Sequence, residues 1–350
     1  MRVDLSLTTR NLAPLSENME FMRVRFSSDN DFLMNEVLVE DFKKAIGLFG
    51  ADAYKKSPYF YLQSDYETND LKFSENIKRI IDANTEIYRV VFNHLMSFLW
   101  LQKDNCCSIG AIYTFLPEHK IVFEKTNGYN YSKWNGMIDE KTSFTNQEIK
   151  ESFELYAKIS AKFYHRNIRI GRSDEPRPDL ITDRSVTPYD IKKETRLERA
   201  FNFLDVARKT RNIPEKIAFF VCIFETLFFG KDSGEIAHQV AERVALYASN
   251  TRIFRLGIYT LVKDAYRIRS TYFHGNSFAN VKDDKLLSIS ERIDFLTRNV
   301  FNQIITSDAD IFLQPTELLE MSFSDLLFED ERQPDGLTID TDLKHKRFNS

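Results

Sequence analysis

The pattern of hydrophobic and polar positions divides the chain into a first part with mixed signals and a second part with almost continuous helical periodicity. Residues 22–26 alternate between apolar side chains and arginines, and the stretch IVFEK at 121–125 alternates in a similar way, which is typical of β-strands. Between them, apolar residues over 75–102 recur at helical spacing and predict a long helix against a small sheet. We therefore expect an α+β domain over residues 1–170.

Helix-start signals and helix breakers place the boundary between the two parts. Thr145 and Glu148 have the spacing of a capping box, which predicts a helix that begins here and ends near residue 165. Residues 171–190 contain three prolines and little periodicity, so we expect a linker there.

The second part predicts an all-α helical bundle over residues 191–306. Five consecutive segments have apolar residues at helical spacing, and Pro214 and Gly230 mark the start and the end of the second segment. The predicted helices span residues 196–210, 214–229, 234–249, 251–274 and 284–306. The expected fold class is thus an α+β N-terminal domain followed by an all-α bundle.

Composition and charge indicate a folded protein and exclude one that is basic overall. A chain of 350 residues exceeds the usual size of one domain, and 43 % hydrophobic residues suffice for folded cores. The net charge of -4 excludes a protein that is basic overall, so any nucleic-acid surface must be a local patch. Residues 191–211, with seven basic and three acidic side chains, are one such patch or an exposed helix face.

Two further features bear on location and chemistry. The longest apolar stretch, residues 217–229, is interrupted by Glu225 and is shorter than the about 20 residues of a membrane span, so we expect a cytoplasmic protein that does not enter a membrane. The cysteines, Cys106, Cys107 and Cys222, lack the spacing of a metal site, and we expect neither a metal nor another cofactor.

The stretch RSTYFHGN at 269–276 closes the fourth predicted helix and offers candidate chemistry. Arg269 lies off the apolar stripe, and Gly275 has the position of a residue that ends a helix. A histidine such as His274 can take the proton from a ribose 2′-hydroxyl or protonate the leaving 5′-oxygen, while an arginine stabilises the charge on the phosphate. Because one histidine serves poorly in both roles at once, the motif predicts a symmetric homodimer. An ordinary helix end explains the same residues, since arginine and histidine also interact favourably with the helix dipole.

The stretch from about residue 196 to 305 resembles the HEPN superfamily of helical nucleotide-binding and RNase domains, specifically its Apea-like branch. The resemblance depends on the segments FETLFFG, EIAHQVAERVALY and AYRIRSTYFHG. The family signature is an arginine, four to six residues, a histidine and often a glycine, which Arg269, His274 and Gly275 match, with Ser270 at a variable polar position. The resemblance implies metal-independent cleavage of RNA at a dimer cleft, in bacterial anti-phage defence or stress response, with the N-terminal domain as sensor or restraint.

Three further residues, Glu225, Asn276 and His238, can be interpreted in the context of this motif. Glu225 interrupts an apolar run, and a buried carboxylate is costly unless it meets a cation, so it orients Arg269 or Arg243 or forms a pair that serves packing alone. Asn276 stands where related toxins have a tyrosine that becomes modified, so we do not expect that form of control. His238 lies on the third predicted helix, and we interpret it as a residue with a structural partner.

The sequence thus favours a metal-independent endoribonuclease that acts on single-stranded RNA or tRNA and leaves a 2′,3′-cyclic phosphate. The alternative is a non-catalytic HEPN module that binds nucleotide or RNA, or that serves as a dimerisation module. Residues 308–335 carry nine acidic residues and one arginine, which leaves a net charge of -8. We expect residues 307–350 to be a loosely docked acidic tail, with the further hypothesis that the tail covers the RNA cleft until activation.

Overall fold

The chain folds into two compact units. The computed structural model describes residues 2–21, 23–65, 76–126, 128, 130–160, 162, 194–230 and 235–328. The first unit comprises Met1–Lys133 and Met137–Lys193, and the second comprises Trp134–Gly136 and Glu194–Ser350. The predicted linker at 171–190 lies outside the described residues.

A six-stranded antiparallel sheet organises the first unit. The strand order is β2-β3-β4-β1-β5-β6, so β1 lies inside the sheet between β4 and β5. The strands are β1 (Arg2–Arg10), β2 (Met19–Phe21), β3 (Val24–Ser27), β4 (Tyr59–Asp65), β5 (Ser108–Leu116) and β6 (Ile121–Thr126).

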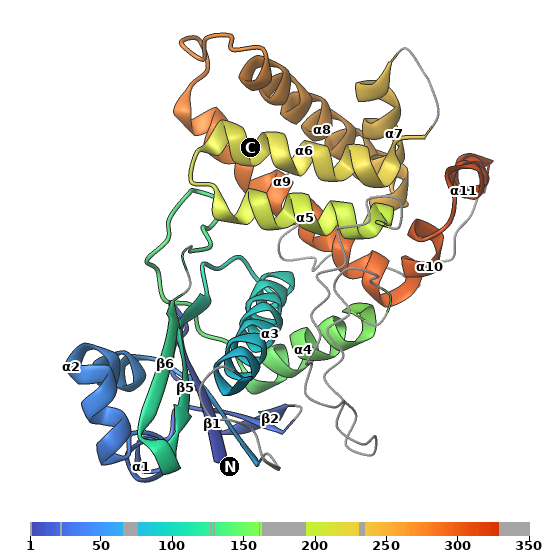
Figure 1. Ribbon diagram of the computed structural model, residues 1–350. Coiled ribbons are helices and arrows are strands. Elements are labelled where there is room, and N and C mark those ends of the chain that lie inside the picture. The colour runs from blue at the N-terminus through green and yellow to red at the C-terminus, as the bar shows by residue number, and fades with distance from the viewer. Residues whose placement is uncertain are drawn as a thin grey trace. The chain divides into compact units, whose positions relative to one another are not determined.

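Helices cover both faces of this sheet. Figure 1 shows α2 (Glu40–Lys56) on one side and α3 (Asn76–Phe98) on the other. Successive side chains of a strand point to opposite faces. In β1, Val3 packs with Ile81 of α3, whereas Ser6 forms a 2.6 Å hydrogen bond with the Tyr54 hydroxyl of α2. The predicted α+β architecture, with a long helix against a small sheet, is confirmed.

The capping box predicted at Thr145 is present at the start of α4 (Asn146–Ser160). The Glu148 backbone N–H donates to Thr145 Oγ1 at 3.2 Å, and the Thr145 backbone N–H donates to Glu148 Oε2 at 2.7 Å. Two backbone donors at the helix start are thereby satisfied. A second capping box joins Thr195 and Glu198 at the start of α5 (Arg196–Lys209).

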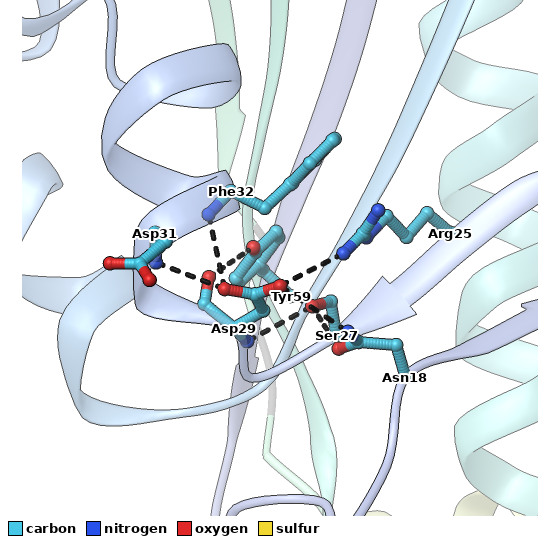
Figure 2. Close-up of polar contacts among 7 residues, drawn as sticks. All are labelled: Asn18, Arg25, Ser27, Asp29, Asp31, Phe32 and Tyr59. Atoms are coloured by element: carbon cyan, nitrogen blue, oxygen red, sulfur yellow. Dashed lines mark hydrogen bonds and ion pairs between the residues drawn. The ribbon is translucent and has the colours of Figure 1, made fainter.

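A polar cluster fixes the chain between β3 and the short helix α1 (Asn30–Phe32), as Figure 2 shows. Asp29 caps α1 by accepting from the Phe32 backbone N–H at 3.1 Å, which lowers the pKa of its carboxyl. Its other oxygen accepts from Arg25 at 3.1 Å, and its carbonyl accepts from the Tyr59 hydroxyl at 2.8 Å. These contacts cap α1 and tie the turn before it to β4, so the role of the cluster is structural.

The second unit is a helical bundle built around α6 (Ile213–Phe228). Figure 1 shows α6 between α5 and α8, and α6 also contacts α7 and α9. Its central position follows from its sequence, because Ile217, Phe220, Phe224 and Leu227 are all fully buried. The other helices are α7 (Ile236–Ala248), α8 (Arg252–Phe273) and α9 (Asp283–Gln303). The five predicted helices are therefore present, with bounds that differ by no more than about one helical turn.

The first part of the acidic segment forms helices that pack on this bundle through a few apolar side chains. After the π-helical turn η5 (Ile304–Asp308), α10 (Ala309–Phe312) and α11 (Thr316–Phe328) follow. Phe312, Leu319 and Phe323 are buried because their side chains supply apolar contacts that outweigh the charge of the segment. The remainder of the predicted tail, residues 329–350, lies outside the described residues.

Within the described part of the chain, none of the helices combines the length and the apolar character that crossing a membrane requires.

Candidate functional site at the end of helix α8

Helix α8 ends in a Schellman motif that fixes the position of His274. The Gly275 backbone N–H donates to Tyr272 O at 3.2 Å, and the Asn276 backbone N–H donates to Thr271 O at 3.0 Å. Gly275 adopts φ +69°, a left-handed conformation that glycine reaches without steric cost. The prediction that Gly275 terminates the helix is confirmed.

We expect Gly275→Ala to lower the free energy of unfolding of the helical unit by about 1 kcal/mol, because an L-residue is strained at positive φ. No atom lies within 4 Å of the position that a Cβ of residue 275 would take, so crowding adds nothing. Gly275→Asn should cost less, since asparagine tolerates this conformation better. Urea denaturation of both variants measures the difference, and equal losses would contradict the backbone explanation.

Arg269 is held against α6 by an ion pair. Its Nη2 lies 3.0 Å from Glu225 Oε2, and the two side chains are only 31 % and 22 % exposed. The guanidinium also lies near the rings of Tyr266 and Phe273, at 6.0 and 5.5 Å from the centroids. Arg269 Nε is buried and makes no hydrogen bond to any described residue. Glu225 therefore orients the guanidinium through Nη2, and the Nε–H donor has no acceptor among the described residues.

The side chains of this pair and of its neighbours are partly or largely buried. Burial raises the pKa of Glu225, and the Arg269 guanidinium opposes that rise. Burial, followed by the nearby Glu225 carboxylate, also raises the pKa of Tyr266. Burial likewise raises the pKa of the Cys222 thiol, again with Arg269 opposing the rise. The ion pair with Arg269 therefore stabilises the charged form of Glu225, because a half-buried carboxylate without a nearby cation is costly.

His274 differs from Arg269 in being exposed. Its backbone N–H donates to Ser270 O at 3.0 Å, while its side chain is exposed and forms no hydrogen bond to the described residues. Helical conformation continues through Phe273, so about 140° around the axis separates the directions of His274 and Arg269. One copy of α8 therefore directs the two side chains toward different sides of the helix. Ser270 and Asn276 are exposed.

The structure separates Arg243 from this site. Arg243 of α7 pairs with Glu320 of α11 and donates to Phe228 O at 2.9 Å, so the cation that Glu225 contacts is Arg269. His238 Nδ1 lies 2.7 Å from the Tyr259 hydroxyl, in agreement with its interpretation as a residue with a structural partner. Tyr259 precedes Arg269 by ten residues, or about 15 Å along α8.

Two residues of the site, Cys222 and Tyr266, were not identified from the sequence. Each precedes a site residue by three positions, Cys222 before Glu225 and Tyr266 before Arg269, and residues three apart share a helix face. That spacing is the signal that could have identified them. In the part of the chain that the structure describes, no group of three His, Cys, Asp or Glu side chains is arranged to hold a metal ion.

Comparison of the chain with protein-family models, with curated proteins and with solved structures finds no significant match. The residues themselves, above all the Arg269–Glu225 pair and the exposed His274, therefore carry the evidence for function.

Proposed function

We propose that the helical unit is a HEPN-type, metal-independent endoribonuclease that cleaves single-stranded RNA or tRNA in the cytoplasm. The observation that supports it best is the Arg-x4-His motif at the end of α8, with Arg269 oriented by Glu225 and His274 open to substrate. The resemblance of residues 196–305 to the Apea-like HEPN branch suggests a role in bacterial anti-phage defence or stress response.

The reaction needs only proton transfer and stabilisation of charge. The ribose 2′-oxygen attacks the adjacent phosphorus and loses its proton to a neutral His274, while the bond from phosphorus to the 5′-oxygen breaks. A protonated His274 gives its proton to that 5′-oxygen, and Arg269 stabilises the negative charge on the phosphoryl oxygens. The products are a 2′,3′-cyclic phosphate and a 5′-hydroxyl.

We infer a homodimer because the two protonation states of histidine are needed at once. The divergent directions of Arg269 and His274 within one copy of α8 favour the same arrangement, since a second copy would supply the missing group to each. Phe273, next to His274, is 53 % exposed and offers apolar surface that a second copy would cover.

The test is cleavage of a mixed pool of single-stranded RNA and tRNA in EDTA. We expect Arg269→Ala to lower the initial rate by about 100-fold or more, as loss of a transition-state charge contact does. Arg267→Ala is the matched control, because Arg267 lies on the same helix, is exposed and pairs with Asp264 instead. Equal rates for the two variants would contradict a catalytic role of Arg269.

The alternative is a non-catalytic HEPN module that binds RNA or nucleotide, or serves as a dimerisation module. The ion pair with Glu225 favours it in one respect, since a guanidinium already bound to a carboxylate also fits a structural role. RNA affinity of wild type and Arg269→Ala, measured on the same samples, distinguishes the two when wild type does not cleave. Binding that depends on Arg269 supports the RNA-binding module.

A further inference from the structure

A buried arginine, Arg243 of α7, lies at the carboxyl end of α6 and binds a carboxylate. Arg243, whose side chain is 10 % exposed, donates from Nη1 to Phe228 O at 2.9 Å and to Glu320 Oε1 at 2.8 Å. Its Nη2 donates to the other oxygen of Glu320, which makes the contact bidentate. The guanidinium also lies 5.0 Å from the centroid of the Phe323 ring.

A second arginine faces the same end of α6. Arg196 Nη1 donates to Thr226 O at 2.9 Å and to Phe229 O at 2.6 Å, and Nη2 donates to Thr316 Oγ1 at 3.1 Å. Burial lowers the pKa of Arg196, and the positive charges of Arg199 and Arg243 lower it further, whereas the Glu320 carboxylate opposes the shift. Backbone carbonyls of and just beyond α6 therefore hold both guanidiniums, independently of any contact with α11.

Gly230 leaves the space that the carboxylate fills. A Cβ built on Gly230 would lie 1.1 Å from Glu320 Oε1 and 3.1 Å from Arg243 Nη1. The anion thus occupies a cavity that only a residue without a side chain leaves open at this position.

Among the residues that the structure describes, the formal charges around these two arginines do not balance. The acceptors of Arg196 within the described residues are two carbonyls and one hydroxyl, all neutral, and Glu320 supplies the only carboxylate that contacts Arg243 there. Within the described residues, two guanidiniums therefore face one carboxylate, besides the partial negative charge of the carbonyls at the end of α6. A phosphate dianion, with two charges and at least three free oxygens, would satisfy both.

The residue that fills the pocket belongs to α11, which has few buried side chains among those that the structure describes. Of the described side chains of α11, at 316–323, only Leu319 and Phe323 are buried, whereas Leu318 and Met321 are 46 % and 63 % exposed. Thr316 and Glu320 are four residues apart, so they share one face of α11 and each contacts one arginine. Releasing α11 would expose both guanidiniums together.

We propose that Arg196, Arg243 and Gly230 form a phosphate-binding site that Glu320 of α11 occupies as an internal, displaceable ligand. This site is separate from Arg269 and His274, and the inference does not depend on the nuclease proposal.

The test measures binding of pyrophosphate to the full chain by isothermal titration calorimetry at constant ionic strength. Glu320→Gln keeps the shape of the side chain and removes its charge, so the variant should bind pyrophosphate about tenfold or more tightly than wild type. Glu317→Gln is the matched control, since it removes the same charge from an exposed position of the same helix and should leave the affinity unchanged. Adding Arg243→Gln to Glu320→Gln should abolish the gain.

Arg243 loses its charged partner in Glu320→Gln, which lowers the stability of that variant. A second variant therefore tests the proposal without removing a charge. Phe323→Ala loosens α11 without changing a charge and should also raise the affinity for pyrophosphate. A gain for inorganic phosphate and pyrophosphate alone identifies a free anion as the ligand, whereas a gain for a short RNA without terminal phosphates identifies backbone phosphate. No gain for any of these ligands, or unfolding of both variants at every phosphate concentration, overturns the proposal.

Discussion

His274→Ala should lower the rate of RNA cleavage by about 100- to 10,000-fold, the usual contribution of a general acid or base, without lowering the free energy of unfolding. The side chain is exposed and forms no hydrogen bond to the described residues, so its removal costs no packing. The backbone contact to Ser270 that closes α8 is kept in the variant. The measurements are initial cleavage rates in EDTA and urea denaturation of the same samples.

His238→Ala is the matched control for this prediction. It removes a second histidine from the same unit, one on α7 that contacts Tyr259, about 15 Å along α8 from Arg269. The control should cleave RNA at the wild-type rate. An equal loss in both variants, or no loss in His274→Ala while wild type cleaves, would remove His274 from the mechanism and leave the binding module as the better explanation.

The helices of the second unit could be predicted from sequence because each has local signals that agree with one another. In α8, Ile258, Leu261, Ala265 and Ile268 recur at helical spacing and are buried, and Gly275 supplies the left-handed stop. The partner of Glu225 could not be predicted in the same way. The choice between Arg269 and Arg243 depends on Glu320, which lies 77 residues beyond Arg243 and pairs with it.

The sheet was harder to predict because its central strand has few of the expected signals. In β1, residues 3–9 are all buried, although Asp4, Ser6 and Thr8 are polar. Asp4 contacts Arg2, and Ser6 contacts Tyr54, so these polar groups are satisfied by partners distant in sequence or by side chains on the same face. Alternation alone predicts a half-exposed strand, whereas pairing with β4 and β5 places this one inside the sheet.

The second prediction with a large effect concerns the packing of α10 and α11 on the bundle. Phe228→Ala should lower the free energy of unfolding of the helical unit by about 3–5 kcal/mol, as expected for a large side chain removed from a packed core. Phe228 is fully buried, and its ring centroid lies 5.4 Å from that of Tyr247, 5.6 Å from that of Phe312 and 5.5 Å from that of Phe323. Its loss should therefore loosen α7, α10 and α11 together.

Urea denaturation followed by far-UV circular dichroism measures this loss. Phe49→Ala is the control, because it makes the same substitution at a side chain that is 95 % exposed and should leave stability within about 0.5 kcal/mol of wild type. Hydrogen exchange should show whether α11 loses protection first, because only two of its described side chains are buried. A small loss in Phe228→Ala would mean that α10 and α11 contribute little to the bundle, and the loose docking expected from their charge would then describe them better than their buried aromatic residues do.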